Sequence, residues 1–312
     1  MYRRLALAAA CLLTIAAPAL AGGVGVPTSR AGVGVGNLPE FTGLRLNFRD
    51  RDVHRVDGVN VTVWPADDKQ NAGAVYRGVG LNLVGNAGRA MDGVFVSLVG
   101  VSVNERARGV FVSGIGASGG DLDGVMIAGI GAGADDVRGI AIAGLGLGCD
   151  DVSGIMLAGL GAGANDITGI AIGGLGFGAH DVTGIMIGGL GAGAEDITGI
   201  AMGGLGLGGK NLQGIMIGGL GVGGETLRGI ALGGALRVDA VQGVALSLAH
   251  QRTTRLVGVS TGIYNRADEA RGLMIGLFNT ADSLHGVQIG LLNHVGSGPA
   301  AARWLPVVHA RF

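Results

Sequence analysis

Residues 181–194 read DVTGIMIGGLGAGA, and close copies of this unit fill the middle of the chain. The first glycine of the unit, Gly184, recurs every 15 residues, and we call it and its counterparts the marker glycines. The central ones are Gly109, Gly124, Gly139, Gly154, Gly169, Gly184, Gly199, Gly214 and Gly229. Similar units begin at Gly43, Gly58, Gly78, Gly93, Gly243, Gly258, Gly272 and Gly286. A repeat this short predicts that each unit adds one small structural layer to a repetitive fold.

Each unit has the pattern of one strand followed by one turn. After the marker glycine the odd positions are apolar and mostly branched, as in Val79, Leu81 and Leu83, and the turns carry the charge, as in Asp150-Asp151. The even positions of the outer units are small or polar: Arg45, Asn47, Asn60, Thr62, Asn82, Ser97, Ser113, Ser247, Ser260 and Gln288. Alternation with a period of two indicates β-strands, so we expect an all-β protein.

Composition narrows the fold class further. With 48% hydrophobic and 14% charged residues the chain is unlike disordered proteins, and its 66 glycines are incompatible with a helical bundle. Beyond the N-terminus no run of 18 apolar residues avoids glycine clusters and charges, so helical membrane spans are not expected.

The N-terminus has the features of a secretory signal peptide over residues 1–21. Arg3 and Arg4 precede the apolar stretch 5–17, and Ala19-Leu20-Ala21 forms a small-residue cleavage site. Removal of this segment changes the formal charge from 22 − 23 = −1 to 20 − 23 = −3, which gives no electrostatic basis for binding nucleic acid. Cys149 is then the one remaining cysteine. We expect an irregular lead-in over 22–40 and a single β-repeat domain over 41–312.

Two architectures accept a 15-residue strand-turn unit. In a β-solenoid each unit is one coil, and equivalent residues stack in parallel. In a meander each unit is one strand of an antiparallel sheet, which can close into a barrel. Three features favour the meander, so an antiparallel meander or barrel is our main prediction and the solenoid with one repeat per coil is the alternative.

The first feature is that the central strands are apolar on both faces, as at Ile185, Met186 and Ile187, whereas a solenoid in water would expose one of these faces. The second is that a solenoid would stack a column of carboxylates about 4.8 Å apart. This column contains Asp121, Asp136, Asp151, Asp166, Asp181 and Asp196. The third is that Met and Ala alternate two residues after the marker glycine, which gives a true period of 30 and suits a hairpin.

The last two units resemble a known group of proteins. Residues 272–279 read GLMIGLFN and residues 286–293 read GVQIGLLN. They resemble bacterial exported surface-repeat proteins built of G-[LV]-Q-[IL]-G-L-x-N units, most clearly over residues 258–312. The resemblance implies the outer membrane or cell surface of a bacterium with an outer membrane, and it implies no activity.

No residue pattern points to catalysis or to a bound cofactor. Gly204–Lys210 matches a phosphate-binding loop by letter, but no helix pattern follows and Asn211 stands where the motif needs Ser or Thr. The six histidines show no metal-ligand spacing. We therefore predict no catalytic, cofactor-binding or metal-binding residues, no nucleotide partner and no enzyme. Whether the aspartate column binds a cation is left open.

These observations predict a non-enzymatic cell-envelope protein, an outer-membrane-associated β-repeat or barrel with a structural or surface role and a membrane as its expected partner. The alternative is a secreted β-solenoid adhesin or scaffold that binds partners through its repeated surface. A small-molecule carrier with an apolar barrel interior is a third possibility.

Overall fold

The computed structural model of the chain describes residues 22–64, 71–297, 299 and 302–312. These residues form strands and turns and contain no α-helix, which confirms the all-β prediction. The expected signal peptide, residues 1–21, lies outside the described residues. The chain divides into two compact units, Met1–Gly144 and Leu145–Phe312.

The first unit contains nine strands that pair in chain order. They are β1 (Gly23–Pro27), β2 (Ala31–Gly36), β3 (Glu40–Arg49), β4 (Arg55–Trp64), β5 (Val75–Asn82), β6 (Gly85–Ser97), β7 (Gly100–Ser113), β8 (Gly116–Ala128) and β9 (Gly131–Ala143). Strands β1 and β2 form an antiparallel pair. Every later pair in the unit, from β2–β3 to β8–β9, is parallel.

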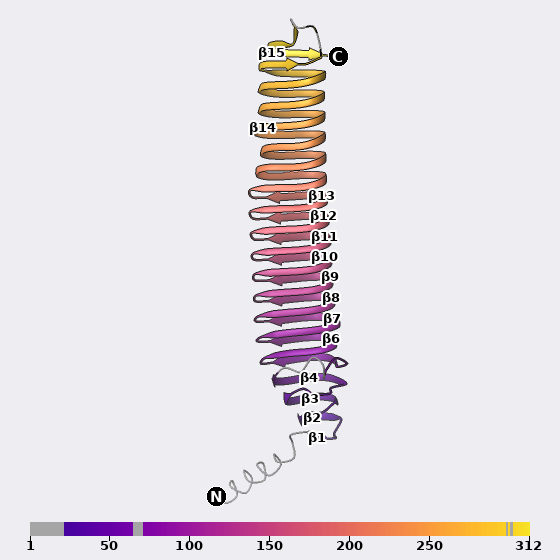
Figure 1. Ribbon diagram of the computed structural model, residues 1–312. Coiled ribbons are helices and arrows are strands. Elements are labelled where there is room, and N and C mark those ends of the chain that lie inside the picture. Colours follow the sequence, from indigo (N-terminus) through magenta and orange to yellow (C-terminus); the bar gives the residue numbers. More distant parts are fainter. Residues whose placement is uncertain (1–21, 65–70, 298, 300–301) are drawn as a thin grey trace, which may run out of the picture. The chain divides into compact units, whose positions relative to one another are not determined.

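The second unit follows the same plan. Its strands are β10 (Gly146–Ala158), β11 (Gly161–Gly173), β12 (Gly176–Gly188), β13 (Gly191–Gly203), β14 (Gly206–Val295) and β15 (Trp304–Arg311). Strands β10 to β14 pair in parallel, and β14 then winds through the following coils without a break (Figure 1). The last coil of β14 pairs with β15 in antiparallel orientation.

The parallel register makes each unit a β-solenoid, so our main prediction of an antiparallel meander or barrel is wrong. Ile170 pairs with Ile185, and Ile185 pairs with Ile200, each in the same strand direction. Residues 15 apart are therefore direct neighbours, one coil above the other. The alternative prediction, a solenoid with one repeat per coil, describes both units.

The marker glycines explain why the chain bends at a fixed interval. All seventeen have positive φ angles, between 113° and 150°, a region that side-chain-bearing residues avoid. A Cβ on Gly184 would lie 2.1 Å from the carbonyl oxygen of Gly169. Only glycine allows both the backbone angle and the close approach of successive coils at this corner. One coil consists of a 13-residue strand, which bends at this glycine, and a two-residue turn such as Gly189-Leu190.

The interior of the central coils accounts for the 30-residue period. Buried Met186 is in register with Ala171 on one neighbouring coil and Ala201 on the other. The next interior column alternates in the same way, with Phe177 between Ala162 and Ala192. A large side chain therefore has small ones on both sides, which lets coils 4.8 Å apart fill a narrow interior without clashes. We attributed this period to hairpins, and in the structure it is volume alternation down a stack.

The lead-in segment 22–40 differs from the irregular structure we expected. Strands β1 and β2 within it form a hairpin, with Gly23 opposite Gly36, and β2 continues the parallel stack onto β3. In the second unit β15 covers the final coil of β14. An antiparallel strand thus ends the parallel ladder in each unit, and the edge at that end is a short strand, of 5 residues in β1 and 8 residues in β15, which is a poor template for another chain.

Candidate functional site

The odd positions after each marker glycine point outward and form what we call the aliphatic face. In the second unit its two main columns contain Ile155, Ile170, Ile185, Ile200, Ile215 and Ile230, then Leu157, Ile172, Ile187, Met202, Ile217 and Leu232. A third column stands at the turns, where Leu145, Leu160, Leu175, Leu190, Leu205 and Leu220 are 45–68% exposed. Most surface hydrophobic residues occur singly, so a continuous stack of them requires an explanation.

The first unit carries an equivalent face. Its outward residues include Leu44, Leu46, Phe48, Val79, Leu81, Leu83, Val94, Val96 and Ile127, which are 36–68% exposed. The same outward pattern thus occurs independently in coil after coil. The period-two pattern of the sequence groups these residues correctly but does not show that they point outward.

The polar even positions lie on the opposite side of the same strands, inside the solenoid. Asn60, Asn82 and Ser113 in the first unit, and Ser260 and Gln288 in the second, are at most 6% exposed. In these outer coils aliphatic side chains face solvent while amides and hydroxyls are buried, which inverts the usual distribution. The signal that could have revealed this inversion is the 14-residue spacing of Asn265, Asn279 and Asn293, which is typical of an internal ladder rather than of a surface.

That asparagine ladder ties the last coils of β14 together. Asn265 Nδ2 donates to Asn279 Oδ1 at 2.8 Å, and Asn279 Nδ2 donates to Asn293 Oδ1 at 2.9 Å. The same Nδ2 atoms also donate to the carbonyl oxygens of Ile275 and Ile289, each at 2.9 Å. All three asparagines are at most 1% exposed, so the ladder supplies partners to their buried amide nitrogens and to the oxygens of Asn279 and Asn293.

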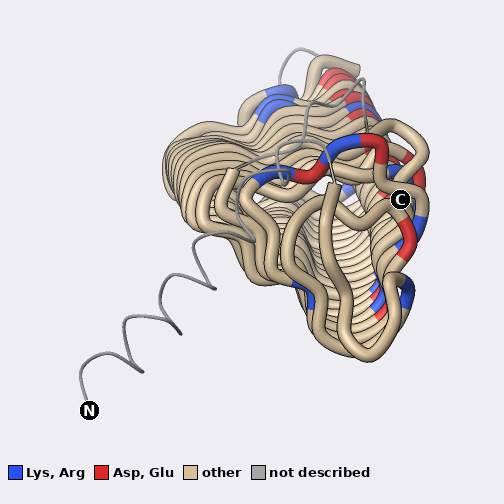
Figure 2. Tube along the Cα trace, turned by 90° about the horizontal axis from the view of Figure 1, so that it is seen from below, with Lys and Arg blue, Asp and Glu red and all other residues tan. Residues whose placement is uncertain are grey.

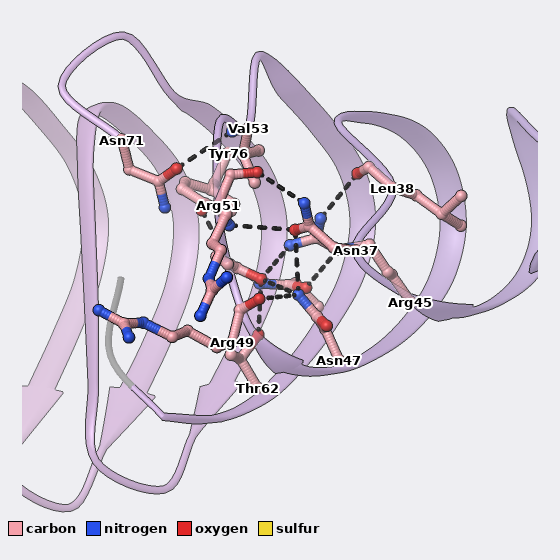
Figure 3. A network of polar contacts seen from close by, with 12 residues as sticks. Asn37, Leu38, Arg45, Asn47, Arg49, Arg51, Val53, Thr62, Asn71 and Tyr76 are labelled. Atoms are coloured by element: carbon pink, nitrogen blue, oxygen red, sulfur yellow. Dashed lines mark hydrogen bonds and ion pairs between the residues drawn. The ribbon is translucent and has the colours of Figure 1, made fainter. Parts of the chain in front are cut away.

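The interior of β3 to β5 instead contains an ion-pair network around Asp50 (Figure 3). The guanidinium of Arg45 is completely buried and binds the Asp50 carboxylate, Asn60 Oδ1 at 2.9 Å and the Leu38 carbonyl at 2.7 Å. The Tyr76 hydroxyl donates to Asp50 Oδ2 at 2.8 Å. Burial, reinforced by the Asp50 charge, raises the pKa of Tyr76 well above its ordinary value. The network has no free position for a reacting group, and its role is to hold the first parallel coils together.

Charged residues concentrate at other corners of the coils (Figure 2). Asp151, Asp166, Asp181 and Asp196 are stacked in register, followed by Asn211. This is the column that we expected a solenoid to disfavour, and its solvent exposure weakens the repulsion. In the first unit arginines are interspersed, as in the Arg108–Asp123 pair at 3.9 Å.

Cationic neighbours neutralise part of this acidic column. Lys210 Nζ donates to Glu195 Oε2 at 2.6 Å. This hydrogen bond lowers the pKa of Glu195 and raises the pKa of Lys210. Asn211 Nδ2 likewise donates to Asp196 Oδ1 at 2.6 Å.

One cluster at this corner contains side chains of the types that coordinate a divalent cation. Ligand atoms of Asp166, His180 and Asp181 all lie within 4.8 Å of one another. His180 Nδ1 is 3.4 Å from Asp181 Oδ1, and its Nε2 is 3.6 Å from Glu195 Oε2. The His180 and Asp181 side chains are 60% and 50% exposed. The histidine therefore already lies near two carboxylates at a solvent-exposed position.

The remaining sequence features show no catalytic arrangement. Within Gly204–Lys210, the segment from Gly206 onward belongs to strand β14, and another coil follows instead of a helix. Cys149 is buried in β10. In the first unit a shallow groove of about 410 Å³ crosses successive coils, and its wall includes Gly85, Gly100 and Gly116 together with Ser102 and Ser118.

Comparisons with known proteins give no relative. The chain matches no family model, no curated protein and no solved structure. In the part of the chain that the structure describes, no helix has both the length and the apolar character needed to cross a bilayer.

Proposed function

We propose that this protein is a non-enzymatic, exported β-solenoid that serves as a surface scaffold or adhesin, with the aliphatic face as its binding surface. The solenoid fold supports the scaffold alternative, because the barrel on which our envelope prediction depended is absent. The N-terminal signal pattern and the resemblance to exported surface-repeat proteins support the location.

The observation that carries the proposal is the inverted polarity of the coils. Aliphatic residues point outward in the coils of both units, and in the outer coils the residues that point inward are polar, although a shift of one residue would bury the aliphatic set. A chain selected only for stability in water would bury them. The aliphatic columns therefore bind a partner and do not form part of the core.

Repetition makes such a surface effective even if each contact is weak. Equivalent side chains recur about every 4.8 Å along the stack, so a partner with an extended apolar surface meets many identical contacts at once. Simultaneous contacts raise the overall affinity far above that of any one of them.

Adsorption to an octyl-coated matrix tests the proposal directly. The folded full-length protein, applied at nanomolar concentration in low salt, is expected to be retained. Replacing outward Ile200 and Ile230 by lysine should abolish retention, and replacing Asn165 and Asn211 by lysine at the acidic corner should not. Passage of the unmodified protein through the matrix would overturn the proposal. Circular dichroism confirms that each variant keeps its strands.

A further inference from the structure

We infer that two copies of this protein pair through the aliphatic face of the Leu145–Phe312 unit, with the two faces packed against each other. This inference rests on the proposed function, because it names the partner of the same surface. Four observations support it: the area of the face, its flanks, its periodicity and the closed end of its stack.

The area is sufficient for a stable dimer. The second unit has ten marker glycines, from Gly154 to Gly286, so at about 4.8 Å per coil its stack is about 48 Å long. The face extends over about five residues of each coil, or about 16 Å at 3.3 Å per residue. The product is about 800 Å², which matches the area that each partner contributes to a standard interface and exceeds the largest patch of most monomers.

The flanks of the face do not oppose pairing in the coils between β10 and β13. One flank is a column of neutral polar residues, Ser153, Thr168, Thr183 and Thr198, and the other is a column of glycines, Gly161, Gly176 and Gly191. The stacked aspartates stand two residues before the Ser/Thr column, on the far side of the marker glycine from the aliphatic columns, and lie outside the face. An apolar centre with an uncharged polar rim is the composition of protein–protein interfaces, and two such faces meet without like-charge repulsion.

The periodicity favours a second copy over a lipid surface. Rows of aliphatic side chains at a constant spacing are complementary to an identical set of rows, which lets two sheets interdigitate about 10 Å apart. A protein that binds lipid through an apolar surface usually surrounds it with lysines, arginines and tryptophans. The columns that form and flank this face between β10 and β13 contain none of these residues, and in the later coils the Ser/Thr column continues with two arginines, Arg228 and Arg271.

The closed end of the stack favours a dimer over a fibre. Strand β15 pairs with the last coil in antiparallel orientation and ends the parallel ladder. It has 8 residues and contains Pro306, so it offers another chain only a short, interrupted edge at that end. Pairing of the same face on both copies is isologous and closes after two subunits.

Sedimentation equilibrium of the full-length protein tests the pairing. The unmodified protein is expected to show twice the 30.8 kDa chain mass, less any cleaved N-terminal segment, and to dissociate on dilution. Ile200→Lys with Ile230→Lys should raise the dissociation constant at least a hundredfold. Asn165→Lys with Asn211→Lys adds the same charge outside the face and should leave the dimer intact. The strand signal in circular dichroism must be unchanged in both variants.

The octyl-matrix assay on the same samples separates this inference from the proposed function. A protein that is monomeric at every concentration but retained on the matrix overturns the pairing and leaves the binding surface in place. A monomer that is not retained overturns both. A dimer that the two face substitutions do not weaken places the contact elsewhere and overturns the pairing, and binding to neutral phosphatidylcholine vesicles by a monomer would identify lipid as the partner instead.

Discussion

The interiors of the central and outer coils are built from different chemistry, although their backbones are alike. Between β10 and β13 the interior is filled by alternating Met and Ala, as at Met186 and Ala201. In β3 to β5 it holds the Arg45–Asp50 network, and at the end of β14 it holds the asparagine ladder. The outward aliphatic columns persist in all of these regions. The backbone ladder and the outer face are therefore constant, and the interior is the part that varies.

The largest expected effect concerns the backbone that both regions share. Gly184→Ala should destabilise its unit by more than about 4 kcal/mol, the range of exceptional substitutions, because a positive φ of 135° and a neighbouring carbonyl oxygen exclude a Cβ. Gly272→Ala in an outer coil should be equally severe, since its φ is 132° and its Cβ would lie 2.1 Å from the Gly258 oxygen. Urea unfolding followed by circular dichroism measures both.

Gly178→Ala is the matched control for this prediction. A Cβ on Gly178 meets no atom within 4 Å, and the residue does not have a positive φ. We expect no loss of stability, and a gain of up to about 1 kcal/mol from the stiffer unfolded chain. Equal losses for Gly178→Ala and Gly184→Ala would contradict the coil geometry.

The next largest effect is expected from the ion-pair network of the outer coils. Asp50→Ala should cost about 3–5 kcal/mol, because it leaves the buried Arg45 guanidinium without its counter-charge. Asp57→Ala removes the partner of Arg55 in an exposed pair of the same region and should cost less than about 1 kcal/mol. Native-state hydrogen exchange of β3 to β5 measures the loss of stability in each variant. A mild effect of Asp50→Ala would mean that water reaches the Arg45 guanidinium.

In the central coils the prediction concerns the volume of a buried side chain rather than its charge. Met186→Ala should cost about 2–5 kcal/mol, because the flanking Ala171 and Ala201 cannot fill the cavity. Ile185→Ala, at the adjacent outward position, should cost clearly less. If the isoleucine proved the more costly of the two, the assignment of inside and outside would be reversed.

The asparagine ladder should contribute less than a packed methionine. Asn279→Ala removes three hydrogen bonds from the interior of β14, and we expect a loss of about 1–3 kcal/mol, seen as faster hydrogen exchange in the last coils. Asn211→Ala removes an exposed amide contact to Asp196 and should change stability by no more than about 0.5 kcal/mol. Similar values for the two variants would mean that the ladder is solvated.

The smallest effect is expected at alkaline pH. Burial raises the pKa of Tyr76 in the folded protein, so the contribution of its neutral phenol is complete below the unfolded pKa of about 10 and is lost as the pH rises above it. Stability measured between pH 9 and 11 should fall more in the unmodified protein than in Tyr76→Phe. The difference in absorbance at 295 nm between the two proteins reports the ionisation of Tyr76, and a parallel decline in the stability of the two proteins would exclude Tyr76 as the cause.

The sequence was sufficient to predict the repeat, its strands and the turns, because glycine spacing and period-two alternation depend on local backbone geometry. It was not sufficient to predict strand direction. Ile185 and Ile200 are equivalent in the repeat in either architecture, and our argument against parallel stacking assumed that exposed aliphatic residues would be rejected. The structure exposes them, and this is the same property that identifies the candidate binding surface. The 14-residue asparagine spacing did not decide the direction either, since an antiparallel meander that turns at Gly272 and Gly286 would also place Asn265, Asn279 and Asn293 opposite one another.

The distance between residues 185 and 200 tests the central claim most directly. In the full-length protein, spin labels are attached to cysteines introduced by Ile185→Cys and Ile200→Cys. These two residues of β12 and β13 pair directly. We predict the strongly broadened electron paramagnetic resonance spectrum of labels about 5 Å apart. In an antiparallel meander these positions would lie about eight residues, or about 26 Å, apart along the strands, and sharp, non-interacting spectra would contradict the outward-facing parallel solenoid.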